Sequence, residues 1–561
     1  MKNKLLCLFL AIVMLISCLA VAGCSSKTDD ETVDGSTTDE SALTTATLTL
    51  WIPTDKSTTE DAILAVQEAM NKILKVKYET AIELHAIPSD KYEAAIDARL
   101  TEIEEKIAFE EAEAERRKQE AKALAAQGIT TAAEETTSEA ETTNAAEETY
   151  VNDLGMTVIR YPEVEEDQMD IFLVRGYENY LSYIEREALS ELDSQLNGTC
   201  KILKQYIYPD FLTYAKIDGT TYAIPNNHAV GEYKYLLVNK RLVDELYWDS
   251  DVLTTLPACE NFILDVKQFT DVTPFLSEVD ANGMYYWSED GEWSLIASQL
   301  TNDMAYNGYA QLKNVLTIKN FVDVYGMMKV LKENDCIAKD PSKVDEFGVG
   351  ILSGDAHLPE QYEEDYYVYI YEKPAFDTDD VYGDMFAVST YTKSLSRSMQ
   401  ILTMLNTDKQ LRTILQYGVE GVHWRVSDSN PNTIDVISKD YKMNILETGN
   451  VYMTYPAAGV PMSEWEYAKK QNLDSRVSPL LGFRRSDYVR EETKEDLAAL
   501  KELSAEYRQM LDAMSAEYFR ENVNTIKKDV NGLDLIKKLT NVENDNVPAS
   551  YYLAYYDAKP K

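Results

Sequence analysis

The sequence predicts an α/β protein with two lobes, each built on a sheet of its own. An apolar run at 48–52 is followed by an amphipathic stretch at 59–75 and a second apolar run at 82–87. Strand, helix and strand in this order are typical of a lobe with a largely parallel sheet. The chain has 561 residues, and at ~100–200 residues per domain this length accommodates two such lobes.

The first residues indicate a bacterial lipoprotein. Lys2 and Lys4 precede an apolar run from Leu5 to Leu19. This run suits a signal-peptide core and is shorter than the ~20 apolar residues of a spanning helix. It leads into the sequence VAGC ending at Cys24, which resembles the lipobox, where the Cys is diacylated. We expect removal of residues 1–23 and lipidation of Cys24.

Two alternatives remain open at this end of the chain. The sequence LISC ending at Cys18 also fits the lipobox loosely, but cleavage there would leave an apolar stretch at 19–22 on the mature chain. An ordinary secretory signal cut after Gly23 would give Cys24 no special role. In each case we expect residues 24–46 to be a flexible tether, because their Ser, Thr, Asp and Glu cannot bury enough apolar surface.

Composition narrows the classes of partner. The formal net charge of −42 argues against nucleic acid. Apart from Cys24, the mature chain keeps Cys200, Cys259 and Cys336, an odd number that forms no disulfide framework but leaves one bridge open. Without a CxxC spacing we expect no metal site, and no motif points to a cofactor.

A polar segment interrupts the first lobe at 101–150. It holds fourteen Glu and five Lys or Arg, and helical periodicity running from about Ser89 fades into it. We interpret it as a solvated helix that ends in a disordered loop. A partner-binding arm is the alternative to an insertion tolerated on the surface.

Periodicity predicts several later elements. Strands are expected at 169–175, 235–238, 366–371 and 385–388, and helices at 321–334, 396–416, 491–518 and 522–539. Asp170 and Arg175 flank the first of these strands and are candidates for an internal ion pair.

Two motifs carry a resemblance to a known family. The sequence YAIPNN at 222–227 is followed by a strand that ends in Asn-Lys at 239–240, with Glu232 just before it. The octapeptide YGVEGVHW at 417–424 is the most specific motif. Together they resemble the extracellular solute-binding lipoproteins (family 1) of bacterial ABC sugar importers, in the branch with a YGxEGxH[YW] motif and an extra C-terminal domain. The resemblance covers most of residues 47–520.

The resemblance implies a periplasmic-binding-protein-like fold whose lobes are joined by hinge crossings and close around a ligand in a cleft. Lobe 1 would comprise 47–228 with 376–440 and carry the insertion. Lobe 2 would comprise 229–375 with 441–561, including C-terminal helices. We expect crossings near 222–236, 366–376 and 440–455.

The same resemblance implies a function. Its members capture a small solute, here a mono- or oligosaccharide, and deliver it to the permease subunits of an ABC importer. We therefore expect a monomer, lipid-anchored at the extracytoplasmic face of the cell membrane.

A sugar site needs aromatic platforms for the apolar ring faces and planar polar side chains for the hydroxyls. The chain has 38 Tyr and 6 Trp, so position rather than number selects the candidates. The candidate ligand-binding residues are Trp51, Asn226, Asn227, Glu232, Trp287, Glu420, His423, Trp424, Tyr452 and Trp465, with Trp293 as a further platform.

Several candidates have a structural alternative. Trp51 could lie in the core, and the Asn pair at 226–227 could shape a turn. Glu232 could pair with Lys234 or Arg241.

The motif at 417–424 has an alternative of its own. Instead of lining a cleft, it could be a loop held rigid by Gly418 and Gly421, with Glu420 capping backbone amides.

No catalytic constellation stands out. The four His form no HExxH or HxH pair, and no GxSxG occurs. We therefore expect a binding protein and not an enzyme. Two other functions stay open, a surface glycan-binding or adhesion lipoprotein without a transporter, and a receptor for a peptide or another solute.

Overall fold

The computed structural model describes residues 45–126, 149–151, 157–159, 161–277, 286–287, 293–299, 313–376, 378–477 and 487–540. The expected signal peptide, Cys24, nearly all of the tether and the outer part of the insertion lie outside these residues. Among the described residues, no helix has both the length and the apolar character that crossing a membrane requires.

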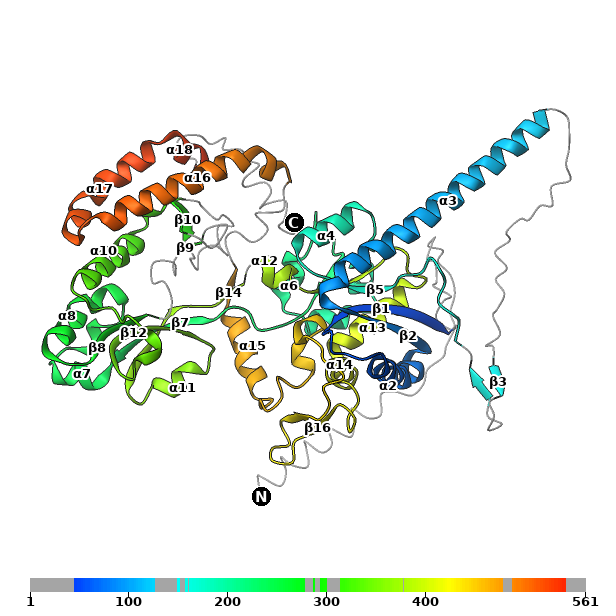
Figure 1. Cartoon of the computed structure of the whole chain (residues 1–561), viewed down its shortest axis with the longest axis horizontal. Helices are drawn as coiled ribbons and strands as arrows, with labels where there is room; N and C mark the ends of the chain where they lie inside the picture. The colour runs from blue at the N-terminus through cyan, green and yellow to red at the C-terminus, as the bar shows by residue number, and fades with distance from the viewer. Residues whose placement is uncertain are drawn as a thin grey trace, which may run out of the picture. The chain divides into compact units, whose positions relative to one another are not determined.

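The first sheet has five strands in the order β2-β1-β5-β15-β6 (Figure 1). The strands β1 (Ala46–Thr54), β2 (Thr80–Pro88) and β5 (Ile171–Val174) are parallel. The strand β15 (Met385–Val388) runs antiparallel to both β5 and β6 (Ala223–Pro225). The sheet therefore joins chain segments that are far apart in the sequence.

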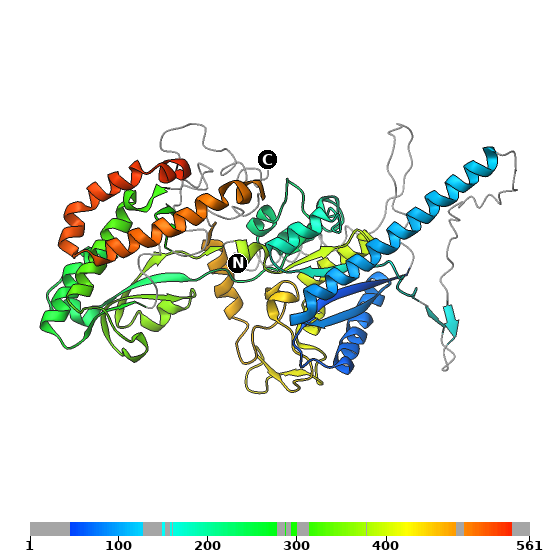
Figure 2. The ribbon, with the colours of Figure 1, turned by 45° about the horizontal axis from the view of Figure 1, so that its top comes forward.

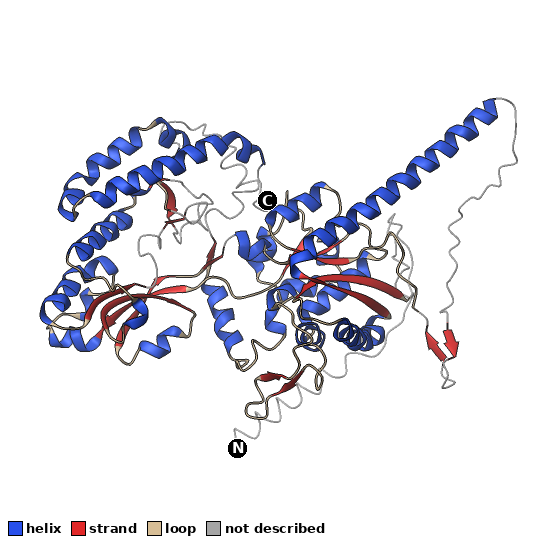
Figure 3. Ribbon diagram, viewed as in Figure 1, coloured by secondary structure: helices blue, strands red, loops and turns tan. Residues whose placement is uncertain are grey.

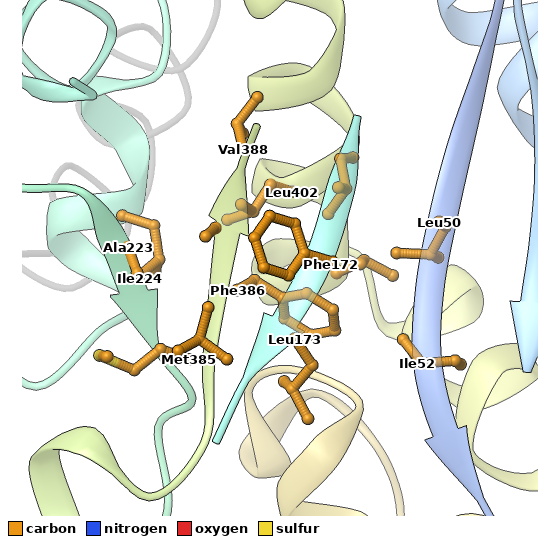
Figure 4. Close-up of a cluster of buried hydrophobic side chains, with 14 of the residues drawn as sticks. Leu50, Ile52, Phe172, Leu173, Ala223, Ile224, Met385, Phe386, Val388 and Leu402 are labelled. Carbon is orange, nitrogen blue, oxygen red and sulfur yellow. The ribbon is translucent and has the colours of Figure 1, made fainter. Parts of the chain in front are cut away.

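Apolar side chains of these strands meet helices in one core. In α2 (Glu60–Tyr78), the Thr59 side chain accepts a hydrogen bond from the Ala62 N–H and caps the first turn. The buried face of α2 then packs on the sheet. The close-up in Figure 4 shows this core, where the labelled residues are Leu50, Ile52, Phe172, Leu173, Ala223, Ile224, Met385, Phe386, Val388 and Leu402.

The second sheet has four strands in the order β13-β7-β12-β8 (Figure 3). They are β7 (Tyr233–Asn239), β8 (Thr273–Ser277), β12 (Phe347–Gly354) and β13 (Tyr366–Glu372). One face packs on α8 (Glu260–Phe269) and α10 (Lys319–Glu333), and the other buries a separate tyrosine-rich cluster. The strand predictions at 235–238, 366–371 and 385–388 are confirmed.

A third hydrophobic core joins the C-terminal helices to α10, the helix that also packs on the second sheet. It is formed by α10 together with α16 (Asp487–Ala513), α17 (Ala516–Gly532) and α18 (Asp534–Thr540). Phe519 contacts Tyr325 at the centre, with ring centroids 5.1 Å apart. Two helices were predicted here, at 491–518 and 522–539, but the structure has three, α16, α17 and α18.

A long helix leaves the first sheet. α3 (Tyr92–Ala126) spans 35 residues and extends well beyond the strands (Figure 2). Its first turns bury Tyr92, Ile96, Leu100 and Ile103, whereas nearly all later side chains with a described exposure are half-buried or exposed. The predicted helical extension is confirmed as far as Ala126, and the predicted loop at 127–148 lies outside the described residues.

The single helix predicted at 396–416 is broken in two. α13 (Leu395–Thr407) ends at Asp408, whose carboxylate accepts a hydrogen bond from the Leu411 N–H and starts α14 (Lys409–Tyr417). The continuous apolar periodicity concealed this cap.

One lobe boundary also differs from the prediction. Tyr441 and Met443, assigned to lobe 2, are buried in the core of the first sheet. The Tyr441 hydroxyl donates to the Leu415 carbonyl, 2.7 Å away. Cys200 is buried in this core too, while Cys259 and Cys336 lie in the core of the second sheet, and all three are free.

The expected ion pair between Asp170 and Arg175 is wrong, because the two residues lie at opposite ends of β5 and have different partners. Asp170 is fully buried and accepts hydrogen bonds from the Thr49 N–H (2.8 Å), Gln168 Nε2 (2.8 Å) and Thr392 Oγ1 (2.6 Å). It thereby joins β1 and the segment after β15 to the start of β5.

Asp170→Ala should lower the free energy of unfolding by about 2–4 kcal/mol, because it leaves several buried donors without acceptors. Chemical denaturation monitored by circular dichroism would measure this. Asp244→Ala, at an exposed position of α7 (Lys240–Glu245), is the control and should change stability by less than ~0.5 kcal/mol. Equal stabilities of the two variants would refute the role of Asp170.

Candidate functional site

Asparagine side chains hold the backbone where the chain passes from the first sheet to the second. Asn227 is buried, accepts a hydrogen bond from the Tyr208 N–H (3.1 Å) and donates to the Tyr206 carbonyl (3.1 Å). Asn450 donates to the same Tyr206 carbonyl at 3.0 Å. The Val451 N–H donates to the Asn227 carbonyl at 2.9 Å. The crossing segment 226–232 and the segment 445–454, where a further crossing was predicted, are thus fastened to each other.

Asn226 is 1% exposed and tied to both segments. Its N–H donates to the Asp384 carbonyl (2.9 Å), and its side-chain Nδ2 donates to the Leu446 carbonyl (2.6 Å). These contacts support the turn-shaping alternative for the Asn pair, and ligand contact stays a prediction.

A third element, α15 (Glu464–Asp474), is fastened to the first crossing. Asn472 accepts a hydrogen bond from the Val230 N–H (3.0 Å) and donates to the His228 carbonyl (2.5 Å). Gln471 donates to the Val230 carbonyl (2.9 Å). The backbone of 228–230 is therefore held by two neighbouring amides of one helix.

The structure brings the predicted Tyr452 and Trp465 together at this place. Their rings meet edge to face, with centroids 5.4 Å apart and planes at 88°. The Trp465 indole N–H donates to the Thr454 carbonyl (2.6 Å), and the ring stays partly exposed, while Tyr452 is buried. Only Trp465 of the pair presents open surface to a solute.

The motif at 417–424 forms a tight loop beside these residues. The Val419 N–H donates to His423 Nδ1 (2.9 Å), and the Trp424 indole donates to the Gly418 carbonyl (2.9 Å). His423 and Trp424 are buried, and burial lowers the pKa of His423. The Gly418 backbone has φ of +82°, and a Cβ there would lie 2.4 Å from His423 Nδ1.

This geometry supports the rigid-loop alternative for the motif. Glu420 is exposed, so of the three predicted residues it alone has a free side chain. The loop lies beside the end of the segment 445–454, because the Trp424 ring is 5.8 Å from that of Tyr455, the next residue.

The other predicted platforms lie elsewhere. Trp51 is within β1, where its ring stacks on His85 at a centroid distance of 4.0 Å. Trp293 packs on the third core near Phe321. Trp287 is in β9 (Tyr286–Trp287), and the position of its side chain lies outside the described part of the chain.

Glu232 is exposed just before β7. It accepts a hydrogen bond from Ser353 Oγ, which also accepts one from Lys234 Nζ at 3.0 Å. Arg241 pairs instead with Glu245 (2.7 Å) and Glu346 (2.6 Å). Of the two cations considered for Glu232, only Lys234 lies in the same group of side chains.

Sequence reasoning missed a charged cluster at the carboxyl edge of the first sheet, where open α/β sheets bind ligands. Arg175, directly after β5, donates from Nε to Glu93 (2.5 Å) and from Nη1 to Glu447 (3.0 Å). Its Nη1 and Nη2 also donate to Ser89 Oγ (2.7 Å) and the Ser89 carbonyl (2.8 Å). The guanidinium therefore links this edge to the segment 445–454.

His228 and Asp384 extend this cluster. His228 Nδ1 lies 2.8 Å from the Asn226 carbonyl, and Nε2 lies 3.5 Å from Asp380 in α12 (Thr378–Tyr382). Burial opposes the charged imidazole, but Asp380, the Asn226 carbonyl and the charge of Asp384 together outweigh it and raise the pKa of His228. Burial raises the pKa of Asp384 to about 6, with a further contribution from Glu447. No group of His, Cys, Asp and Glu in the described ranges suits a metal ion.

The positions of Arg175 and Asp384 in the sequence could have indicated this charged cluster. Each is next to a correctly predicted strand, Arg175 after β5 and Asp384 before the antiparallel β15. Both therefore had to lie at the same edge of the sheet. Recognising this required the strand direction, which the sequence alone does not give.

Comparisons with known proteins agree with the fold. No family model matches the sequence. A solved structure of the N-glycan transport solute-binding protein NgtS from Streptococcus pneumoniae has a TM-score of 0.51 at 16% identity and covers 92% of this chain and 100% of that chain. The chain has the fold of a solute-binding protein. The predicted two-lobed α/β class is confirmed.

The chain is also similar to a second solved structure and to a curated protein. The NgtS complex with Man1GlcNAc has a TM-score of 0.42 at 16% identity, covering 91% of this chain and 100% of that chain. A carbohydrate ABC transporter substrate-binding protein from S. pneumoniae serotype 4 is 23% identical over 321 residues, 54% of this chain. The match spans 65% of that relative, a little under two thirds of its length.

Asp384→Asn should stabilise this solute-binding fold at pH 7.5. The folded state holds the Asp384 proton more tightly than the unfolded chain, so ionisation of Asp384 reduces stability as the pH rises from about 4 through about 6. The variant should gain about 1–3 kcal/mol at pH 7.5 and little at pH 4. Urea unfolding at both pH values measures the difference. A loss of stability at pH 7.5 would contradict the assigned cause.

Proposed function

We propose that this chain is the substrate-binding component of a bacterial ABC importer and that it captures a mono- or oligosaccharide at the crossings. The observation that carries the proposal is that the segment 445–454 and α15 are both fastened to the crossing segment 226–232, with the rings of Tyr452 and Trp465 in contact beside it. The similarity to a carbohydrate ABC transporter substrate-binding protein and to an N-glycan transport protein supports a sugar as the solute.

Exposure ranks the proposed ligand contacts. Trp465 and Glu232 have free surface beside the crossings, so they are the first residues we assign to the ligand. The Asn227 amide and the buried rings of Tyr452 and Trp424 would act mainly by holding this surface in place. Permease subunits would receive the sugar from the loaded protein.

A thermal-shift screen of residues 47–561 against neutral oligosaccharides, including Man5GlcNAc, tests the proposal. A ligand that binds only the folded state stabilises it by about 2.7 kcal/mol at a hundredfold excess over Kd. We expect a shift with one sugar class and no release of product. Trp465→Ala should then weaken binding at least tenfold, because a sugar loses its platform.

Tyr247→Ala is the matched control, since Tyr247 is a large aromatic residue that is 95% exposed just after α7, outside the crossing segment. Trp465→Phe should retain part of the affinity. No shift with any sugar would refute the sugar assignment and favour a peptide or another solute. Binding without a permease encoded nearby would favour an adhesion lipoprotein.

We also propose that acylated Cys24 anchors the chain at the extracytoplasmic face of the membrane. Cys24→Ser should release the protein into the culture medium, because a diacylated Cys supplies the two chains that stable anchoring requires. Immunoblots of membrane and medium fractions measure this. Cys18→Ser is the control and should remain in the membrane fraction. The opposite pattern would move the anchor to Cys18.

A further inference from the structure

Asp384 and Asn226 form a cross-strand pair at the carboxyl edge of the first sheet. Met385 pairs with Pro225 in the antiparallel ladder, and the Asn226 N–H donates to the Asp384 carbonyl one step further on. Directly opposite residues of an antiparallel pair project from the same face, with Cβ atoms ~4.5–5.5 Å apart. The two side chains therefore share one side of the sheet edge.

Both side chains of this pair have unused acceptors. Asn226 is 1% exposed and donates through Nδ2 to Leu446, but Oδ1 receives no hydrogen bond within the described structure. The Asp384 carboxylate likewise receives none from a described residue, but Asp384 is half-buried, and this burial disfavours its charge. For Asn226 Oδ1, which is buried, the missing donor costs ~1–3 kcal/mol. The pair thus lacks hydrogen-bond donors.

The described cationic side chains around the pair, Arg175 and His228, do not supply these donors, because both have other partners. Every N–H of Arg175 faces Glu93, Ser89 or Glu447, so the guanidinium has no donor left for a ligand anion. His228 is directed at the Asn226 backbone carbonyl and at Asp380. Glu447 adds another carboxylate beside Asp384. The region offers acceptors and negative charge, and its cations are engaged.

We propose that Asp384 and Asn226 accept hydrogen bonds from hydroxyl or ammonium groups of the solute, so that the ligand is a neutral sugar or an amino sugar and not an acidic sugar. This inference rests on the proposed function and narrows its substrate class. A uronic or sialic acid would bring a further carboxylate to Asp384 and Glu447, where the described cations Arg175 and His228 already have acidic partners.

Ordered water is the competing donor. Buried waters commonly bond to polar groups that would otherwise lack a partner. Water bound permanently between Asn226 and Asp384 would make the pair structural, and its removal would then change stability without changing sugar affinity. The two explanations differ in what a substitution at Asp384 does to binding.

The first arm of the test varies the ligand. Thermal shift and isothermal titration of residues 47–561 at pH 7.5 compare Man5GlcNAc, chitobiose and glucosamine with galacturonate oligomers and sialyllactose. We expect binding within the neutral or amino set and at least hundredfold weaker binding of every acidic sugar. Tight binding of an acidic sugar overturns the inference and leaves the proposed function standing.

The second arm varies the protein, using the sugar that binds most tightly. Asp384→Asn and Asp384→Ala should each weaken binding at least tenfold, because a hydrogen bond to a charged acceptor is lost or becomes neutral. Since Asp384→Asn is expected to raise stability, weaker binding would not come from unfolding. Asp210→Asn, in α6 (Pro209–Tyr214), removes another acid whose pKa is raised by burial and should leave affinity unchanged.

The outcomes separate the two proposals. Unchanged sugar affinity in both Asp384 variants overturns the inference in favour of water, while sugar capture stands. A loss of equal size in Asp210→Asn also overturns it, because the effect would then follow from removing any buried acid. No binding by any sugar in either set removes both proposals.

Discussion

The structure depends on satisfying the backbone where it leaves the sheets. A strand inside a sheet has ladder partners, but a segment that crosses from one sheet to another loses them while it remains buried. Here the Asn472 side chain replaces those partners at His228 and Val230, while Asn227 and Asn450 bond the neighbouring backbone at 206–208. An amide both donates and accepts, so one side chain can hold two segments at once. Apolar side chains of the same size would leave these backbone groups unpaired.

The sequence predicted the sheets well because periodicity reports burial. The run at 48–52 lies within β1, and the aromatic run at 366–371 and the apolar run at 385–388 each became a strand. Prediction from periodicity failed where a polar side chain ends a helix although the apolar periodicity continues. Asp408 divides the helix predicted at 396–416 because its carboxylate caps a new first turn, a local competition that periodicity does not register.

The candidate site was predicted less well, and the reason is spatial. Asn226 and Tyr452 were selected from motifs, and they lie on two segments that are hydrogen-bonded to each other. Arg175 was noticed only as a possible partner of Asp170, at the other end of the same strand. Its true partners, Glu93 and Glu447, are distant in sequence. Such a cluster follows from sheet order and strand direction, which only the folded chain reveals.

The length of α3 makes its outer part susceptible to proteolysis. At ~1.5 Å per residue its 35 residues measure roughly 50 Å, and about two thirds of them follow Ile103. That outer part is stabilised mainly by pairs such as Arg116–Glu113 and Arg117–Glu113, each contributing only ~0.2–0.5 kcal/mol. The helix should therefore fray inward from its far end. Proteases would cut this outer part first and stop near Ile107, which still packs on the first core, leaving the sheet beneath it intact.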